Sequence, residues 1–129
     1  TTLASFREEY VVVNFFASWC PPCQLEEPQL VQFAAEHGSG AKAGAVRAAI
    51  VGVVFGDSAS NARSFDVSNR AGWPAVVDPG SAIALSYGVE SPPETFVIAP
   101  GGRVVAKLDG SVTAAALDSV IDGGTGAES

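Results

Sequence analysis

The sequence contains no methionine, one histidine and two cysteines, and each scarcity narrows the possibilities. Metal centres usually take three or four protein ligands, so a lone His37 at the far end of a predicted helix does not favour a metal site with the cysteines. Because the chain begins at Thr1 rather than at a methionine, we expect a mature or truncated form from which any targeting segment has been removed.

Basic residues are also scarce, with 7 Lys and Arg against 14 Asp and Glu and a net charge of −7. Nucleic-acid binding needs clustered Lys and Arg, so no nucleic-acid partner is expected. No apolar run approaches the roughly 20 residues that span a bilayer. The 129 residues, 47% hydrophobic and 16% charged, have the size and composition of one globular domain. We predict a monomeric domain over residues 1–122 and a flexible tail over residues 123–129.

Runs of β-branched and aromatic residues alternate with helical periodicity along the chain. This pattern indicates an α/β fold with a mixed central sheet and helices on both faces. Residues 38–48, rich in Gly and Ala, receive no assignment. The predicted strands are Tyr10–Phe16, Ile50–Phe55, Pro74–Val77, Thr95–Ile98 and Arg103–Leu108, and the predicted helices are Cys20–His37, Ser58 or Ser60 to about Asn69, Ala82–Tyr87 and about Val112–Ile121 after a Ser111 cap.

The two cysteines, Cys20 and Cys23, follow a buried strand and open a helix. A disulfide across so short a loop would remove only about 2 kcal/mol of unfolded-state entropy, so a chemical role is favoured over a purely structural one. Residues three apart share a helix face, and a helix N-terminus favours a thiolate. Pro21 and Pro22, between them, carry no amide hydrogen, so the first donor to the Cys20 sulfur should be the Cys23 amide.

Two segments of the chain resemble one family. VVVNFFASWCPPCQLEEP (residues 11–28) resembles the active-site segment of the extracytoplasmic thioredoxin-like proteins TlpA, ResA and CcmG, the last also called DsbE. YGVESPPETFVIAPGGRVVAKLDG (residues 87–110) resembles the second signature of the same family. The resemblance runs from about residue 10 to about residue 122 and implies a thioredoxin-like fold.

The resemblance implies roles for individual residues at the thiol site. Cys20 matches the exposed nucleophile and Cys23 the buried resolving thiol, with Pro21 and Pro22 forming the active-site loop. Glu26 matches a partly buried acid beside the thiols, which would accept the Cys23 proton.

A second group of residues matches the side of the family site that holds the substrate chain. Trp19 matches the aromatic residue before the first cysteine, and Pro93 matches a cis-proline in the loop that faces the disulfide. Pro92 precedes it, and Glu94 matches a second acid found in the CcmG branch. We therefore predict substrate contacts at these four positions and a cis Pro92–Pro93 bond.

Several residues depart from the family pattern or allow a second interpretation. Ordinary thioredoxins carry a buried Asp six residues before the first cysteine, where this chain has Asn14, so a cytosolic thioredoxin is disfavoured. Helical geometry alone would select Glu27, nearly two turns from Cys20, and only the resemblance selects Glu26. Both glutamates could instead be solvated charges. Trp73 is expected to pack in the core or at its rim.

The family implies a thiol–disulfide oxidoreductase with no cofactor beyond the Cys20–Cys23 disulfide. We expect a reductant that serves cytochrome c maturation outside the cytoplasm, with apocytochrome c as a substrate and a membrane thiol–disulfide relay protein as a partner. The alternatives are an oxidase that forms disulfides in secreted proteins and a metal-carrying or redox-sensing module. The direction of electron flow depends on the potential and the partner, which the sequence does not contain.

Overall fold

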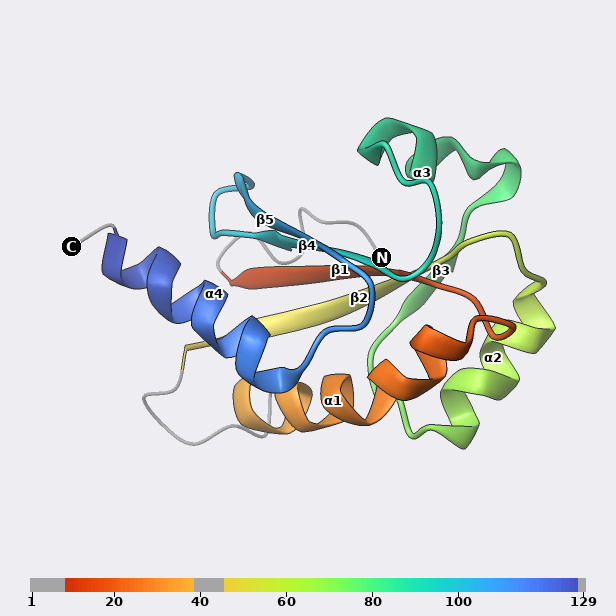
Figure 1. Cartoon of the computed structure of the whole chain (residues 1–129), viewed down its shortest axis with the longest axis horizontal. Helices are drawn as coiled ribbons and strands as arrows, with labels where there is room; N and C mark the ends of the chain where they lie inside the picture. The colour runs from red at the N-terminus through yellow and green to blue at the C-terminus, as the bar shows by residue number, and fades with distance from the viewer. Residues whose placement is uncertain (1–8, 39–45, 128–129) are drawn as a thin grey trace.

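The computed structural model describes residues 9–38 and 46–127, so most of the unassigned segment 38–48 lies outside the described residues. The predicted alternation of strands and helices is confirmed (Figure 1). The elements are β1 (Tyr10–Phe16), α1 (Pro21–His37), β2 (Ala48–Val54), α2 (Ala59–Ser68), β3 (Ala75–Val77), a 3₁₀ turn (Pro79–Ser81), α3 (Ala82–Tyr87), β4 (Glu94–Ile98), β5 (Val104–Asp109) and α4 (Ala114–Ala127).

The five strands form one mixed sheet in the order β3-β2-β1-β4-β5. β1 pairs in parallel with β2 and antiparallel with β4, so every residue of this central strand is buried. Its β-branched and aromatic composition suits a strand covered on both faces. The mixed sheet with helices on both faces confirms the predicted fold class.

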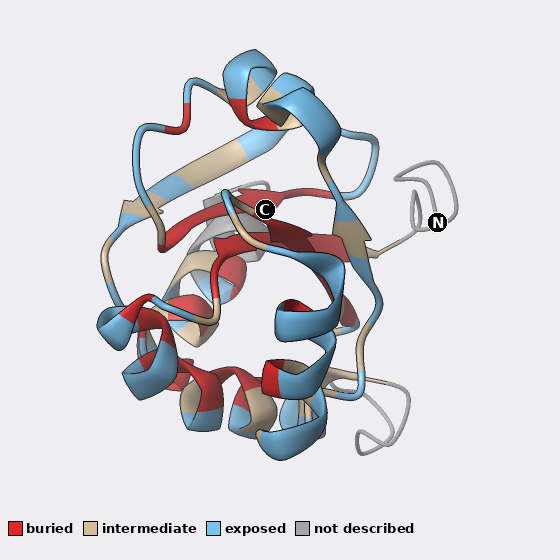
Figure 2. Ribbon diagram, turned by 90° about the vertical axis from the view of Figure 1, so that its right-hand side faces the viewer, coloured by how far each residue is buried: buried red, intermediate tan, exposed pale blue. Residues whose placement is uncertain are grey.

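Helices α1, α2 and α4 lie on one side of the sheet and α3 on the other (Figures 1 and 2). Alternation along β1 sends Val12 toward the core under α1 and α4, and Val11 and Val13 toward the core under α3. The same alternation places Asn14 and Phe16 on the α1 side. Trp73 packs at the rim of the α1–α4 core, as expected.

Helix boundaries depart from the prediction at the end of the chain. The expected end of the last helix at Ile121 is wrong, because α4 continues to Ala127 through part of the predicted tail. Glycine costs only about 1 kcal/mol against alanine in a helix, and no proline follows to stop it. The predicted Ser111 cap is also wrong: Thr113 Oγ1 accepts from the Ala116 amide at 3.0 Å. At α2, the capping oxygen belongs to Ser58, which accepts from the Asn61 amide.

Candidate active site

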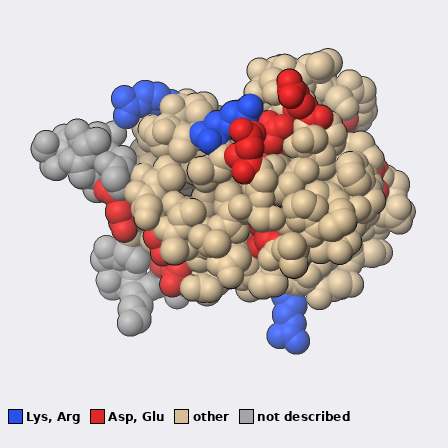
Figure 3. All heavy atoms as spheres, viewed as in Figure 1, with Lys and Arg blue, Asp and Glu red and all other residues tan. Residues whose placement is uncertain are grey.

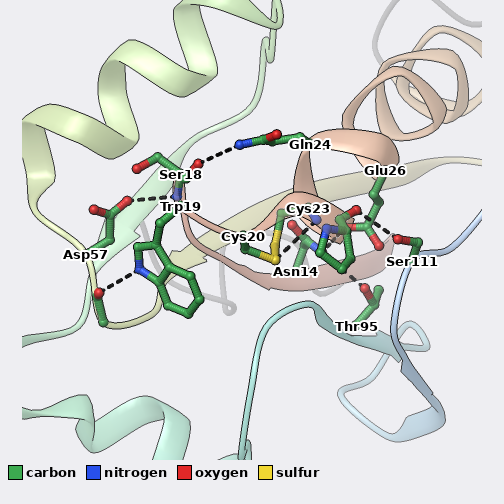
Figure 4. Close-up of a disulfide and its surroundings, with 12 residues drawn as sticks. Asn14, Ser18, Trp19, Cys20, Cys23, Gln24, Glu26, Asp57, Thr95 and Ser111 are labelled. Carbon is green, nitrogen blue, oxygen red and sulfur yellow. Dashed lines mark hydrogen bonds between the residues drawn. A yellow bond between two sulfur atoms is a disulfide. The ribbon is translucent and has the colours of Figure 1, made fainter.

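Cys20 is the N-cap residue of α1 and is joined to Cys23 by a disulfide, with Cα atoms 5.2 Å apart (Figure 4). Pro21 and Pro22 occupy the first helical positions, where their missing amide hydrogens leave no bond unmade. The Cys23 amide donates to Cys20 Sγ at 3.2 Å, which confirms the predicted first donor. The first sulfur therefore sits where the helix dipole favours negative charge.

The expectation of an exposed Cys20 is wrong for this disulfide form. Cys20 is 2% exposed and Cys23 is 1% exposed. Both cysteines pack in a cluster with Phe16 of β1 and Phe65 of α2. Exposure does not distinguish the two sulfurs here, so the order of attack rests on their positions in the helix.

The loop before the disulfide is held by the segment after β2. Trp19 is 55% exposed, and its Nε1 donates to the Gly56 carbonyl at 2.9 Å. Gly56 has φ +58°, a backbone conformation that residues with a side chain rarely adopt. The Ser18 amide donates to Asp57 Oδ2 at 2.8 Å. Although burial acts to raise it, hydrogen bonds from Ser18 and Ser58 hold the pKa of Asp57 below its usual value. An exposed aromatic ring is thus fixed beside the disulfide.

Glu26 lies three residues after Cys23 on α1, with its side chain 1% exposed. Its Oε1 accepts from Asn14 Nδ2 at 2.7 Å, and its Oε2 accepts from the Val112 amide at 3.0 Å (Figure 4). The same Asn14 amide donates to Thr95 Oγ1 at 3.1 Å, across the β1–β4 pair. The Glu26 carboxyl group is therefore held by Asn14 of β1, itself bonded to Thr95 of β4, and by the amide of Val112 in the segment before α4. The interpretation of Glu26 as a solvated charge is wrong.

Burial raises the pKa of Glu26 to about 7, against the lowering effect of the hydrogen bonds from Val112 and Asn14. Desolvation disfavours the carboxylate, whereas donors to it favour the charged form. A carboxyl group with a pKa near 7 exchanges protons readily at neutral pH, which is the property a general base needs.

Glu27 is also 1% exposed, so the solvated interpretation fails for it too. Burial raises its pKa to about 8, with further contributions from the charges of Asp66 and Glu26. Burial raises the pKa of Asp66, on α2, to about 6. The sequence analysis missed Asp66, since nothing in its local context distinguishes it from a surface acid.

The loop before β4 contains a cis Pro92–Pro93 peptide bond, as predicted. Pro93 is buried, and its carbonyl accepts from the Gly110 amide at 3.0 Å. The residues expected to contact substrate therefore include one that is buried and one, Pro92, that is partly exposed.

Glu94, also expected beside the substrate, is instead 4% exposed beneath this loop. Its Oε2 accepts from the amides of Glu90 and Ser91 at 2.9 and 3.0 Å, and its Oε1 lies 3.4 Å from Lys107 Nζ. Although burial acts to raise it, these amides and Lys107 hold the pKa of Glu94 below its usual value. The carboxylate therefore holds the loop rather than a substrate.

The segment before α4 docks on the first turns of α1. Ser111 Oγ donates to the Pro22 carbonyl at 2.8 Å, and the Ala114 amide donates to Gln29 Oε1 at 2.9 Å. Together with the Val112–Glu26 bond, these contacts fix the far side of the site. Sequence reasoning missed them because they join residues more than eighty positions apart.

In the described part of the chain, one group of side chains has the spacing of a metal site. Glu36, His37 and Asp118 lie together away from the cysteines. His37 Nε2 is 2.7 Å from Asp118 Oδ1, and His37 Nδ1 is 2.9 Å from the Val46 carbonyl. The contacts of His37 with Asp118 and with the Val46 carbonyl account for this arrangement.

The fold and this site define a thioredoxin-like protein with a Cys-x-x-Cys disulfide at the start of its first helix and a cis-proline loop. The chain belongs to the AhpC/TSA family, whose model matches residues 1–107. No helix among residues 9–38 and 46–127 is long and apolar enough to cross a membrane.

The relatives agree with the resemblance to the ResA and DsbE proteins. The thiol:disulfide interchange protein HelX of Rhodobacter capsulatus is 33% identical over 86% of this chain and 58% of its own. The DsbE homologue of Paracoccus denitrificans is 35% identical over 77% of this chain and 50% of its own. ResA of Bacillus subtilis is 30% identical over 86% of this chain and 59% of its own. The chain thus spans between half and three-fifths of the length of these curated relatives.

Solved structures support the same fold. A DsbF homologue from Corynebacterium diphtheriae matches with a TM-score of 0.81 and 28% identity, covering 95% of this chain and 76% of that one. A thioredoxin-family thiol:disulfide interchange protein from Chlorobium tepidum matches with a TM-score of 0.78 and 25% identity, covering 95% and 83%. The predicted thioredoxin-like fold is confirmed.

Proposed function

We propose that this chain is a thiol–disulfide oxidoreductase acting on proteins that carry thiols or disulfides. The observation that carries the proposal is the position of the Cys20–Cys23 disulfide: it lies at the N-terminus of α1, one helical turn before the buried carboxyl group of Glu26, which has a pKa of about 7. The relatives named thiol:disulfide interchange proteins support it.

In the reducing direction, the Cys20 thiolate attacks one sulfur of a substrate disulfide, whose other sulfur leaves as a thiolate and takes a proton from water. The Cys23 thiol then transfers its proton to the Glu26 carboxylate and attacks Cys20 Sγ. The mixed disulfide breaks, and the second substrate sulfur leaves as a thiolate. The substrate has gained two electrons, and this protein's dithiol has become the Cys20–Cys23 disulfide.

The raised pKa of Glu26 lowers the free-energy cost of the proton transfer from Cys23. Transfer from a thiol of pKa ~8.5 to a carboxylate whose acid has a pKa of about 7 costs about 2 kcal/mol. The same transfer to an ordinary Glu carboxylate would cost about 6 kcal/mol. Burial of Glu26 therefore removes most of the cost of activating Cys23.

We further propose that the protein works as a reductant outside the cytoplasm, with apocytochrome c as a substrate and a membrane thiol–disulfide relay protein restoring the dithiol. Negative charge on Glu26 near the thiols disfavours the Cys20 thiolate that a strong oxidant must stabilise. The second candidate is an oxidase of secreted proteins, favoured by the amide of Cys23 that donates to Cys20 Sγ.

Equilibration with glutathione buffers separates these candidates, because it measures the reduction potential. A reductant should lie toward about −270 mV and a strong oxidant toward about −120 mV. The reduced Cys23→Ser variant, incubated with a peptide whose two haem-binding cysteines form a disulfide, should accumulate a mixed disulfide with that peptide. A potential near −120 mV with rapid oxidation of unfolded proteins would favour the oxidase.

A further inference from the structure

Asp57 is an acidic residue in the segment that follows β2, and the proposed exchange reaction does not use it. Its Oδ2 accepts from the Ser18 amide at 2.8 Å, 39 positions away in the sequence, and its Oδ1 accepts from the Ser58 amide at 2.9 Å. Hydrogen bonds to an ionised carboxylate are roughly twice as strong as those between neutral groups. One side chain therefore joins the start of α2 to the residue two positions before Cys20 (Figure 4).

Capping of α2 does not account for the contact with Ser18. An acid near the start of a helix commonly stabilises that helix. Here α2 begins at Ala59, and its cap is the Ser58 side chain, which accepts from the Asn61 amide at 3.1 Å. Asp57 Oδ2 is bonded instead to the loop before the disulfide. This bond therefore serves that loop rather than the helix.

The same segment also holds the side chain of Trp19. The indole Nε1 donates at 2.9 Å to the carbonyl of Gly56, the residue before Asp57. From α1, Gln24 Nε2 donates to the Ser18 carbonyl at 3.1 Å. The amide and carbonyl of Ser18 and the indole of Trp19 are thus all bonded to residues outside the loop (Figure 4).

The Trp19 ring is held in place although it is exposed, and it directly precedes Cys20. Tryptophan is enriched among the residues that contribute most to binding in protein interfaces. A side chain that is already immobilised loses less conformational freedom when a partner binds. A fixed, exposed indole beside Cys20 is therefore suited to contact a polypeptide that carries the reacting substrate cysteine.

We propose that Asp57 is a positioning residue that holds the Trp19 indole as one side of the substrate site, and that the fixed indole makes the chain favour disulfides in polypeptides over small disulfides. The indole contacts residues that flank the substrate cysteine, which a small disulfide lacks. The positioning role stands on the hydrogen bonds, whereas the preference rests on the proposed function. Although burial acts to raise it, hydrogen bonds from Ser18 and Ser58 hold the pKa of Asp57 below its usual value, so the carboxylate is charged at neutral pH.

The preference is measured as the ratio of two second-order rate constants for attack by the reduced protein, one on a peptide disulfide and one on hydroxyethyl disulfide. Asp57→Ala should lower this ratio by about 2- to 10-fold, because the peptide must then immobilise the indole when it binds. A ratio equal to that of the wild type would overturn the proposal. If Asp57→Ala does not fold, Asp57→Asn, which has nearly the same size and keeps one acceptor oxygen, should show a smaller decrease.

Ser58→Ala is the matched control. It removes the side chain that caps α2 but keeps the backbone amide that donates to Asp57, so the bond to Ser18 stays in place. This variant should keep the wild-type ratio. If it lowered the ratio as much as Asp57→Ala does, the effect would come from a weakened α2, and the positioning role would be wrong.

A double-mutant cycle tests whether Asp57 acts through Trp19. Trp19→Ala should lower the ratio by more than Asp57→Ala, because it removes the contacting ring itself. The double variant should match Trp19→Ala alone, since Asp57 then has no indole to position. Multiplied losses in the double variant would show that the two residues act independently, which would overturn the proposal.

The indole ¹H–¹⁵N NMR signals give a readout that does not depend on activity. The chain has two tryptophans, and Trp73→Phe assigns the signal of Trp19. In Asp57→Ala the Trp19 indole hydrogen should exchange with solvent faster than in the wild type, and in Ser58→Ala it should not. An unchanged rate in Asp57→Ala would overturn the positioning role. A wild-type protein that attacks neither disulfide would refute the proposed function instead, while the indole exchange would still decide the positioning role.

Discussion

The side-chain amide of Asn14 donates a 2.7 Å hydrogen bond to Glu26 Oε1, twelve positions along the chain. Thioredoxins place an acid on this strand, and here the strand supplies a neutral donor while the helix above it supplies the acid. Because an amide donates to a carboxylate but cannot itself take a proton at neutral pH, this arrangement assigns the two tasks to different residues. Asn14 orients the carboxyl group, and in the proposed exchange Glu26 takes the proton.

Replacing Glu26 by Gln should slow resolution of the mixed disulfide by about 100-fold while leaving the first attack by Cys20 nearly unchanged, because only the second step needs a base. Stopped-flow mixing of the reduced protein with a disulfide-linked fluorescent peptide separates the two steps. Glu36→Gln, on the exposed side of the same helix, is the control. Equal slowing of both steps would remove Glu26 from proton transfer.

Replacing Asn14 by Leu should raise the pKa of Glu26 further above about 7, because the change removes a donor to the carboxylate. A hydrogen bond to a charged group is worth about 1.5–3 kcal/mol, so the pH profile of resolution should move up by about one unit or more. Thr95→Val is the matched control, since it removes the other partner of the same amide and leaves the Glu26 bond in place. An Asn14→Leu profile that matches the control would contradict this role.

Iodoacetamide should modify Cys20 before Cys23 in the reduced protein, and the apparent pKa of the Cys20 thiol should lie below the usual ~8.5. The reason is that Cys20 caps α1 and its sulfur accepts a hydrogen bond from the Cys23 amide. Mass spectrometry of the partly alkylated protein identifies the modified cysteine. Cys20→Ser should abolish exchange, and Cys23→Ser should accumulate mixed disulfides. Faster alkylation of Cys23 would reverse the assigned roles.

Replacing Glu94 by Gln should weaken the loop that contains the cis Pro92–Pro93 bond, because its carboxylate accepts from the Glu90 and Ser91 amides and pairs with Lys107. We expect a loss of about 1–3 kcal/mol in unfolding free energy at pH 7. Chemical denaturation monitored by circular dichroism measures it.

The lowered pKa of Glu94 also predicts how this loss of stability changes with pH. The pKa of Glu94 is lowered in the folded state, so its stabilisation is present above the unfolded pKa of about 4.3 and is lost as pH falls through the folded value. The difference between wild type and Glu94→Gln should therefore shrink under acid conditions. Asp109→Asn, at an exposed partner of the same Lys107, should have little effect. A difference that stays constant with pH would show that the carboxylate charge is not what holds the loop.

Much of the fold follows from short-range patterns. The apolar run Tyr10–Phe16 could be predicted as a buried strand, and the Pro-Pro pair after Cys20 as a helix start, because propensity and the missing amides act within a few residues. The end of α4 could not be predicted, since three glycines in the last turns weaken a helix without stopping it. The cis Pro92–Pro93 bond was predicted through the family resemblance alone.

The functional site likewise combines features set by the local sequence with features set by the tertiary structure. The sequence by itself determined which sulfur atoms can form a disulfide, because the three-residue spacing of Cys20 and Cys23 is fixed by the covalent chain. Only the tertiary structure decided how those atoms are tuned. Glu26 and Glu27 are neighbours of identical chemistry, yet Glu26 is held by the Val112 amide, 86 positions away, while the pKa of Glu27 is raised by burial and by the charge of Asp66 on α2. A pKa depends on the groups and the water that surround a side chain, and distant segments of the folded chain supply both.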